Sequence, residues 1–248
     1  GQDLSGATLR HMARWLWLLY IALTLICGFG MWLLGMTPFQ AINHAMTTVA
    51  TGGFGTEDTS FNGFGNGLKV WTTLFMFLCG ISLPLYIAIL RKRSWQPLRK
   101  NEEAWLYASL LAIFCVIAIS KRLYSDDFVS HWSDELINTV FNVVSIMTST
   151  GYASGDYNLW PPAAKGLLLF AMVIGGCAGS TAGGLKVSRI LLFVRMLRIE
   201  VERVYRPNQV VVLRLNGHPV PEGARGQTFV ILTAGAAIMA FAGYIMLA

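Results

Sequence analysis

The sequence predicts an all-α integral membrane protein built from repeated units, each with a spanning helix, a short re-entrant helix and loop, and a second spanning helix. Three observations support this fold class. Of the 248 residues, 54% are hydrophobic and 13% are charged, about half the charged share of an ordinary soluble domain. Long uncharged runs recur along the chain, and a Gly-rich loop follows each of two short helices. This composition argues against a soluble enzyme and excludes a disordered chain.

Five apolar runs are expected to cross the membrane. The first, Trp15–Leu34, has twenty residues without a charge, which at ~1.5 Å per residue spans a hydrocarbon core of about 30 Å. The second contains Pro84, which is expected to kink the helix. The second half of the fourth is rich in glycine. The runs after the first are Val70–Leu90, Ala104–Ser120, Gly166–Leu185 and Thr228–Ala248.

Two shorter helices are expected between the spans. Phe39–Ala50 follows a Thr-Pro pair, in which a capping residue precedes proline at the first helical position. Leu136–Ser149 follows a Ser-Asp-Glu run, a cap with acids in the first turn. Each helix would be about 20 Å long, too short to cross a membrane. A short helix and a Gly-rich loop between two spans are typical of a re-entrant segment, because irregular backbone at membrane depth must be buried or line a water-filled cavity.

Basic residues indicate which side of the membrane each loop occupies. Residues 35–67 contain no Lys or Arg, whereas the second and fourth spans are each followed by a basic cluster. Since Lys and Arg are enriched in cytoplasmic loops, the re-entrant loops are expected outside the cell. The net charge of +6 has the same explanation, and nothing indicates nucleic-acid binding. The clusters are Arg91, Lys92, Arg93, Arg99 and Lys100, and Lys186, Arg189, Arg195, Arg198, Arg203 and Arg206.

The order of elements recurs along the chain. Asn43 and the pair Thr51-Gly52 recur 99 positions later as Asn142 and Thr150-Gly151. The surrounding order of elements recurs as well, which indicates an internal repeat; the alternative is two unrelated helical hairpins. Because glycine has no Cβ atom, it can adopt backbone angles that orient successive carbonyl groups toward the same side. Several such loops around one axis would form a ring of carbonyl oxygens, which can replace the hydration shell of a large monovalent cation.

Three motifs together resemble a known family. Residues 47–56, 147–154 and 175–186 read TTVATGGFGT, MTSTGYAS and GGCAGSTAGGLK. They look like the Trk/Ktr/HKT superfamily of potassium transporters, and within it the TrkH-type membrane subunit. The resemblance implies a fold of potassium-channel type, with four span–pore-loop–span units in one chain. Since the sequence opens with Gly1 and stops at Ala248 within an apolar run, we expect part of a longer polypeptide, containing the second unit, the third unit and the start of the fourth.

Four regions follow from this interpretation. Residues 1–100 form one span–pore-loop–span repeat, and residues 101–206 form another whose second helix is broken by glycines. Residues 207–225 form a cytoplasmic β-hairpin connector, expected because β-forming residues flank Asn216-Gly217, a strong two-residue turn. Residues 226–248 form the first helix of a further, truncated repeat.

The resemblance also implies a potassium filter and a gate. Carried over by position, the filter residues are Thr51, Gly52, Gly53, Thr150, Gly151 and Tyr152, with Gly52 and Gly151 as the one filter glycine of each repeat. The gate is an intramembrane loop with Gly175, Gly176, Gly179, Ser180, Thr181, Gly183 and Gly184. Its five glycines disfavour a continuous helix, and its two hydroxyls would face water or ions; the alternative is a small-residue helix-packing face. Asp156 is either an outer attractor for cations or a turn cap.

The implied function is potassium uptake across the bacterial inner membrane by a multi-pass protein. Potassium would be the transported ion, not a resident cofactor, and no constellation of catalytic residues indicates an enzyme. The implied partners are cytosolic nucleotide-binding regulatory subunits of TrkA type, membrane lipid, and a second copy of the whole protein in a homodimer. One alternative is an ion-coupled secondary transporter with a substrate site at the broken helix. Another is a non-conducting scaffold subunit.

Overall fold

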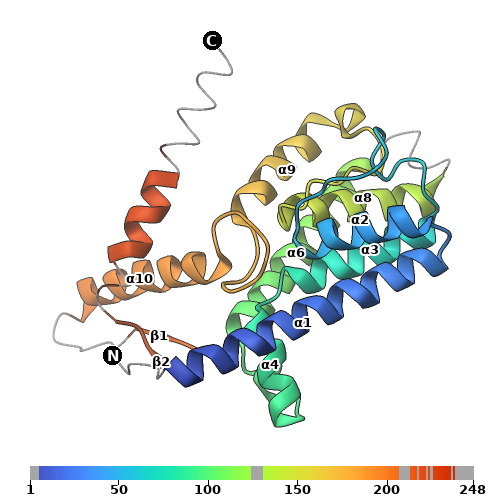
Figure 1. Ribbon diagram of the computed structural model, residues 1–248. Helices are drawn as coiled ribbons and strands as arrows, with labels where there is room; N and C mark the ends of the chain where they lie inside the picture. The colour runs from blue at the N-terminus through green and yellow to red at the C-terminus, as the bar shows by residue number, and fades with distance from the viewer. Residues whose placement is uncertain are drawn as a thin grey trace.

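The computed structural model describes residues 6–123, 131–206, 213–216, 218–221, 223, 226–235 and 237. Over these residues the chain is mostly helical, as predicted, and α10 leads away from the bundle of the preceding helices (Figure 1). The elements are α1 (Gly6–Leu33), α2 (Pro38–Val49), α3 (Asn66–Cys79), α4 (Leu83–Lys92), α5 (Gln96–Arg99), α6 (Glu102–Arg122), α8 (Trp132–Met147), η1 (Tyr157–Leu159), α9 (Pro162–Ile174), α10 (Val187–Tyr205), β1 (Arg214–Leu215) and β2 (His218–Pro219).

Two helices of the described residues, α1 and α6, are each long and apolar enough to cross a membrane, judged by length and composition. They correspond to the first and third predicted spans. The side chain of Asn101 caps α6 by accepting a hydrogen bond from the Ala104 amide, and α6 has acids in its first turn and basic residues in its last. This charge order complements the helix dipole. On α1, Trp17 and Leu25 are 68% and 67% exposed, so an apolar surface faces outward, as on a helix surrounded by lipid.

The second predicted span is broken, not kinked. The helix α3 ends at Cys79, α4 begins at Leu83, and the two helices meet at 86°. Pro84 lies in the first turn of α4, where its missing amide hydrogen costs no helical hydrogen bond. The prediction of one continuous helix kinked at Pro84 is therefore wrong, because the proline starts a new helix after the break at residues 80–82.

The fourth predicted span is also interrupted. The helix α9 ends at Ile174, and residues 175–186 form a loop before α10 begins at Val187. We call residues 175–186 the glycine loop. The loop joins two helices that run in different directions (Figure 1), which agrees with the predicted glycine-rich break.

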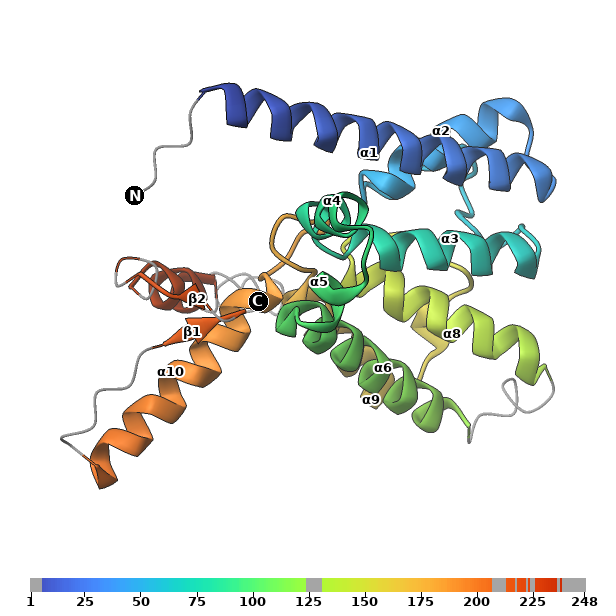
Figure 2. The same ribbon diagram turned by 90° about the horizontal axis from the view of Figure 1, so that it is seen from below.

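The short helices α2 and α8 lie within the bundle. The helix α3 packs against both of them, α1 covers α2, and Figure 2 shows α1, α3 and α8 running alongside one another. Between them lies an aromatic cluster of Phe61, Phe141 and Tyr152, each no more than 2% exposed. Burial of aromatic side chains is among the largest contributions to packing, so this cluster fixes the two short helices relative to each other.

The C-terminal part contains a short antiparallel strand pair. Arg214 pairs with Pro219 and Leu215 with His218, where the β-hairpin was expected, although the turn residue Gly217 lies outside the described residues. Residues 226–235 are helical, and most of the fifth predicted span lies outside the described residues. The division of the chain into four regions remains a prediction.

Candidate functional site

The loops that follow α2 and α8 have the same hydrogen-bond pattern. We call residues 50–55 the first loop and residues 148–153 the second loop. In both, three consecutive amides bond back to carbonyls in the last turn of the preceding helix, at 2.7–3.1 Å in the first loop and 2.9–3.0 Å in the second. The amides belong to residues 50–52 and 148–150, and the carbonyls to residues 46–48 and 144–146. Each group has its counterpart 98 positions later in the chain.

The backbone angles show the same register. Thr51 and Ser149 have φ of +52° and +57°, and Gly53 and Gly151 have φ of +68° and +87°. Both pairs are 98 positions apart, whereas matching the Thr-Gly steps by sequence gave 99. The structure therefore pairs Gly53, not Gly52, with Gly151. The sequence was misleading because both loops contain a Thr-Gly step, and the additional glycine of the first loop concealed the one-residue shift.

The buried polar residue of each short helix follows this corrected register. Asn142 is 1% exposed and its side chain bonds both the amide and the carbonyl of Ser154, at 3.0 and 3.4 Å. Its counterpart 98 positions earlier is His44, which is fully buried, and not Asn43. His44 Nδ1 lies 2.9 Å from the Gln40 carbonyl oxygen. The residue equivalent to Asn142 is therefore His44 and not the expected Asn43, and both equivalent side chains are buried.

Glycine is required at positions 53 and 151 for different reasons. A Cβ at Gly53 would lie 1.8 Å from the carbonyl oxygen of Thr150, because the two loops touch there. A Cβ at Gly151 would meet nothing within 4 Å, but its positive φ disfavours any side chain. A Cβ at Gly52 would come no closer than 3.6 Å to another atom, and no positive φ is present at this residue.

The carbonyls of the two loops form a bonded set and a free set. Thr47 Oγ1 donates to the Phe54 carbonyl at 2.8 Å, and Ser145 Oγ donates to the Tyr152 carbonyl at 2.7 Å. The carbonyls of residues 51–53 and 149–151 accept no hydrogen bond from the described part of the chain. Because both sets follow the partly negative C-terminus of a helix, these unbonded carbonyls are suited to coordinating a cation.

The side chain of Tyr152 joins the second loop to α2. Its hydroxyl donates to the His44 carbonyl at 3.2 Å, accepts from Thr48 Oγ1 at 3.3 Å and lies 2.5 Å from Thr47 Oγ1. The family resemblance predicts Tyr152 as a filter residue. The structure shows that its side chain bonds the second loop to α2, the earlier of the two short helices.

The glycine loop lies against both of these loops. Thr51 Oγ1 donates to the Thr181 carbonyl at 2.9 Å, and a Cβ at Gly183 would lie 3.1 Å from the Ser149 side chain. The loop also folds closely on itself, since a Cβ at Gly175 would lie 2.2 Å from the Gly183 carbonyl oxygen. The predicted gate residues are therefore brought together next to the predicted filter residues.

The glycine loop also fills the break between α3 and α4. The Cys177 amide donates to the Gly80 carbonyl at 2.9 Å, and the Leu83 amide donates to the Gly179 carbonyl at 3.0 Å. A helix end leaves such backbone groups without intrahelical partners. The two broken helices thus satisfy each other's backbone at their breaks.

Two further expectations can be compared with the structure. The hydroxyls of Ser180 and Thr181 donate to the backbone carbonyls of Cys177 and Cys79, at 2.6 and 3.2 Å; that their oxygens also face water or ions remains a prediction. Asp156 accepts a hydrogen bond from the Asn158 amide at 2.8 Å and caps η1. Of the two alternatives for Asp156, the structure shows the cap.

A buried carboxylate, which no sequence pattern predicts, lies at the glycine loop. Glu103 in the first turn of α6 is 5% exposed and accepts hydrogen bonds from the amides of Ala178 and Ser188. An acid in the first turn of a helix is usually explained by the helix dipole alone, so no sequence pattern indicates the longer-range contacts of Glu103. A substrate site at the break would need buried charged contacts, and this carboxylate is bonded to the chain's own amides.

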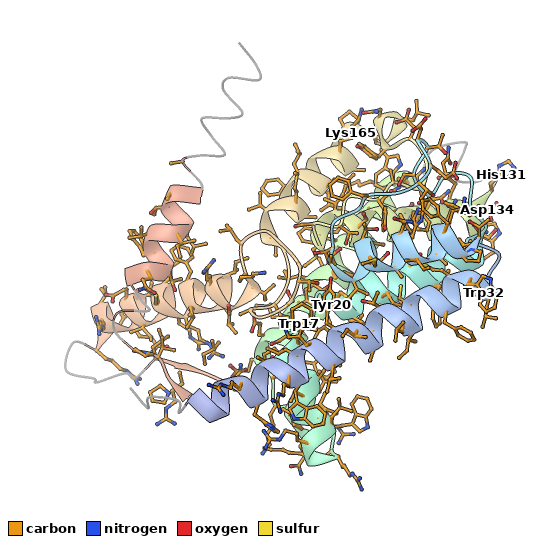
Figure 3. The ribbon with its side chains drawn as sticks, in the orientation of Figure 1. Trp17, Tyr20, Trp32, His131, Asp134 and Lys165 are labelled. Atoms are coloured by element: carbon orange, nitrogen blue, oxygen red, sulfur yellow. The ribbon has the colours of Figure 1, made fainter. Side chains whose placement is uncertain are left out.

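A polar region lies at the other end of the bundle. His131 and Asp134 at the start of α8 lie at the same end as Trp32 of α1, and Lys165 lies near the start of α9 (Figure 3). A cavity of about 550 Å³ there is lined by residues that include His131, Asp134 and Glu135. Arg122 forms an ion pair with Glu135 and stacks over the Trp160 ring at 4.6 Å. Within the described residues, no group of three or more His, Cys, Asp or Glu could hold a metal ion.

The family is decided by sequence comparison. A family model named TrkH and described as a cation transport protein matches residues 2–246. The chain belongs to the TrkH family. It is 33% identical over 213 residues to the Trk system potassium uptake protein TrkH of Vibrio parahaemolyticus, covering 85% of this chain and 44% of that protein. It is 35% identical over 207 residues to the Trk system potassium uptake protein TrkI of Halomonas elongata, covering 82% of this chain and 41% of that protein.

The fold of this TrkH-family chain agrees with a solved structure. The crystal structure of the potassium transporter TrkH from Vibrio parahaemolyticus matches with a TM-score of 0.87 at 29% identity, covering 97% of this chain and 52% of that one. The chain therefore spans about half the length of the relatives that it matches. Membership of the family and the apolar helices confirm the expected location in a bacterial inner membrane, and the family is one of ion transporters rather than enzymes.

Proposed function

We propose that this chain forms two of the four filter loops, and the gate, of a potassium uptake pore. The observation that carries the proposal is the set of free carbonyls at residues 51–53 and 149–151, which follow two helix C-termini in loops that touch at Gly53 and Thr150. Rings of carbonyl oxygens stabilise a large monovalent cation in place of its water shell. The TrkH and TrkI relatives are named potassium uptake proteins, which supports potassium as the ion.

The proposed filter residues are the six predicted from the family resemblance, with one change in how the two loops are matched. Thr51, Gly52, Gly53, Thr150 and Gly151 supply carbonyls, and Gly53 replaces Gly52 as the counterpart of Gly151. Tyr152 contributes mainly by holding the second loop. Two loops cannot close a ring, so two further loops of the intact protein complete the filter in this proposal.

The glycine loop is proposed as the gate. It contacts the filter loops through Thr51 and Ser149, and its position next to them would block the path of an ion. Its glycines permit a change of backbone conformation that other residues would resist. Opening then requires this loop to leave the filter.

The proposed assembly is a homodimer of the intact protein in membrane lipid, with cytosolic nucleotide-binding subunits of TrkA type docked near the β1–β2 strand pair. The relatives are named Trk system proteins, which supports a membrane complex. The strand pair is also connected to the membrane helices, because the Asn216 amide donates to Glu102 Oε2 at 3.2 Å.

Tracer uptake into proteoliposomes that contain the intact protein tests the pore. Rubidium uptake should be inhibited by potassium far more than by sodium, although one glycine per loop predicts weaker selectivity than a longer filter gives. Equal sodium and potassium flux would reject the filter, and no flux would reject the pore.

A glycine pair provides the matched variants for this test. Gly151 and Gly155 both have positive φ and open space around the Cα, so alanine at either position costs about the same backbone strain, on the order of 1–2 kcal/mol. Gly151→Ala should lower the potassium-to-sodium ratio about tenfold, whereas Gly155→Ala should leave the ratio unchanged. An equal effect of the two variants would show that strain, and not the filter, is being measured.

A further inference from the structure

Glu103 is the one Asp or Glu with an exposed fraction below 9% among the described residues. Its Oε1 atom accepts two hydrogen bonds, from the Ala178 amide at 2.5 Å and from the Ser188 amide at 3.1 Å. Ala178 lies in the middle of the glycine loop and Ser188 lies in the first turn of α10. A single carboxylate oxygen of α6 therefore bonds both the loop and the helix that follows it.

Such an arrangement needs compensation, because burying a carboxylate is costly unless it is well bonded. The two amide hydrogen bonds to Glu103 supply part of this compensation. The N-cap residue of α10, Lys186, makes no side-chain capping bond, so the amides at this helix end have no capping side chain from their own helix. The negative charge of Glu103 also lies at the positive end of the α10 dipole. Glu103 thus caps α10 from a different helix while it bonds the glycine loop.

We infer that Glu103 is a positioning residue of the gate, which holds the glycine loop in its blocking position and couples that loop to α10. The inference rests on the proposed function of the glycine loop. If Ala178 leaves Glu103, the loop loses its bond to α6; if α10 moves, Ser188 moves with it and disturbs the same oxygen.

The contacts of the neighbouring residue extend this coupling toward the strand pair. Glu102 Oε2 lies 3.0 Å from Arg195 of α10 and 3.2 Å from the Asn216 amide beside β1. Two consecutive glutamates of α6 therefore hold the strand pair, α10 and the glycine loop. A partner that displaces the strand pair or α10 would reach the loop through Glu103.

Single-channel recording of the intact protein tests the role in gating. Glu103→Ala removes both hydrogen bonds, and bonds to a charged group are strong enough that the open-to-closed ratio should rise about tenfold. Glu103→Gln keeps an acceptor oxygen, so it should recover most of the closed state and show a rise of about threefold or less. Glu200→Gln is the matched control, because this α10 carboxylate is 67% exposed and pairs only with Arg203 among the described residues. An unchanged ratio in Glu103→Ala would overturn the inference.

Chemical labelling of Cys177 tests the same point without ion flux. Cys177 precedes Ala178 and is buried, as are Cys27, Cys79 and Cys115, which are replaced by alanine so that one thiol remains. In Glu103→Ala, a small thiol-reactive methanethiosulfonate should modify Cys177 about tenfold faster, since the loop leaves its position more often. An unchanged labelling rate would overturn the inference about Glu103, whether or not the protein conducts potassium. A protein that conducts no potassium would reject the proposed function.

A double-mutant cycle separates a role in the gate from general loss of packing. Deletion of residues 179–183 is itself expected to raise the open probability. If Glu103 acts through the loop, Glu103→Ala should add less than about twofold to the open-to-closed ratio of the deletion variant, because interacting residues are not additive. A full tenfold effect in that background would show that Glu103 acts elsewhere.

Discussion

The first and second loops share a backbone but differ in the aromatic residue that follows the glycine. Phe54 is 76% exposed, whereas its counterpart Tyr152 is 2% exposed and bonds α2 through its hydroxyl. If α2 and the second loop belong to successive repeats, as predicted, the second loop is held by the repeat that precedes it. In the proposed pore of four loops, the same arrangement would place Phe54 against the short helix of another unit.

The loops also differ in their link to the glycine loop. Thr51 Oγ1 donates a hydrogen bond to the Thr181 carbonyl, whereas Ser149 meets Gly183 only by contact. The first loop is therefore joined to the predicted gate by a polar bond, and the second is joined more firmly to the protein around it. The two loops therefore have the same backbone conformation but different contacts, and single substitutions can separate the effects of those contacts.

The largest effect is expected at Gly53. Alanine there would place a Cβ 1.8 Å from the Thr150 carbonyl oxygen at a positive φ, so the two loops would have to move apart. Rubidium uptake by the intact protein should fall by about a hundredfold or more, equivalent to roughly 2.7 kcal/mol. Gly52→Ala, with no atom closer than 3.6 Å, should keep uptake within about twofold of the unmodified protein.

This pair of variants also decides the register of the repeat. The 98-residue register makes Gly53 the filter glycine, and the 99-residue register makes it Gly52. If Gly52→Ala abolishes uptake while Gly53→Ala is tolerated, the register derived from the backbone is wrong. Size-exclusion chromatography of both variants is the control for folding.

Sequence patterns predicted the elements better than their ends. Charge-free runs located α1 and α6 because a membrane span depends on length and hydropathy, and five glycines located the break after α9 because glycine disfavours helix. The break before Pro84 could not be seen, since it depends on the glycine loop satisfying the carbonyl of Gly80 and the amide of Leu83. These are contacts between residues nearly a hundred positions apart, which local patterns do not contain.

The candidate site was predicted in its residues but not in its connections. The Thr-Gly steps identified both loops, but the one-residue shift between Gly52 and Gly53 is a matter of backbone angle and contact, not of residue type. The role of Glu103 was missed because its partners are backbone amides, and any residue except proline can supply those. Side-chain patterns cannot indicate which backbone groups a carboxylate will meet.

A smaller effect is expected from removing the Tyr152 hydroxyl. Tyr152→Phe keeps the ring among Phe61 and Phe141 but removes the hydrogen bonds to α2, at a cost of about 1–2 kcal/mol. The potassium-to-sodium ratio measured by tracer competition should fall about fivefold, and the thermal unfolding midpoint should fall by a few degrees. An unchanged ratio would mean that the bond between repeats does not set the filter geometry.

The matching test at Phe54 examines whether both loops are built alike. This side chain is 76% exposed here, so this chain alone predicts that Phe54→Ala is harmless. If the proposed pore repeats the Tyr152 arrangement in every unit, Phe54→Ala in the intact protein should lower the same ratio at least as much as Tyr152→Phe does. Harmless substitution in the intact protein would break the comparison between the two loops.

An effect of the same size, on opening rather than on selectivity, is expected at the link between the first loop and the glycine loop. Thr51→Val has the same shape and removes the hydroxyl, which lies 2.9 Å from the Thr181 carbonyl oxygen and 2.7 Å from the Ala50 carbonyl oxygen, at a cost of about 1 kcal/mol. The open-to-closed ratio in single-channel recordings should rise about fivefold, while the potassium-to-sodium ratio stays the same because the carbonyl positions are not changed. Ser149→Ala is the control, since Ser149 makes no hydrogen bond to the glycine loop among the described residues, and its open-to-closed ratio should not change. If both variants alter selectivity and neither alters opening, the hydrogen bond of Thr51 determines the filter geometry and does not affect the opening of the gate.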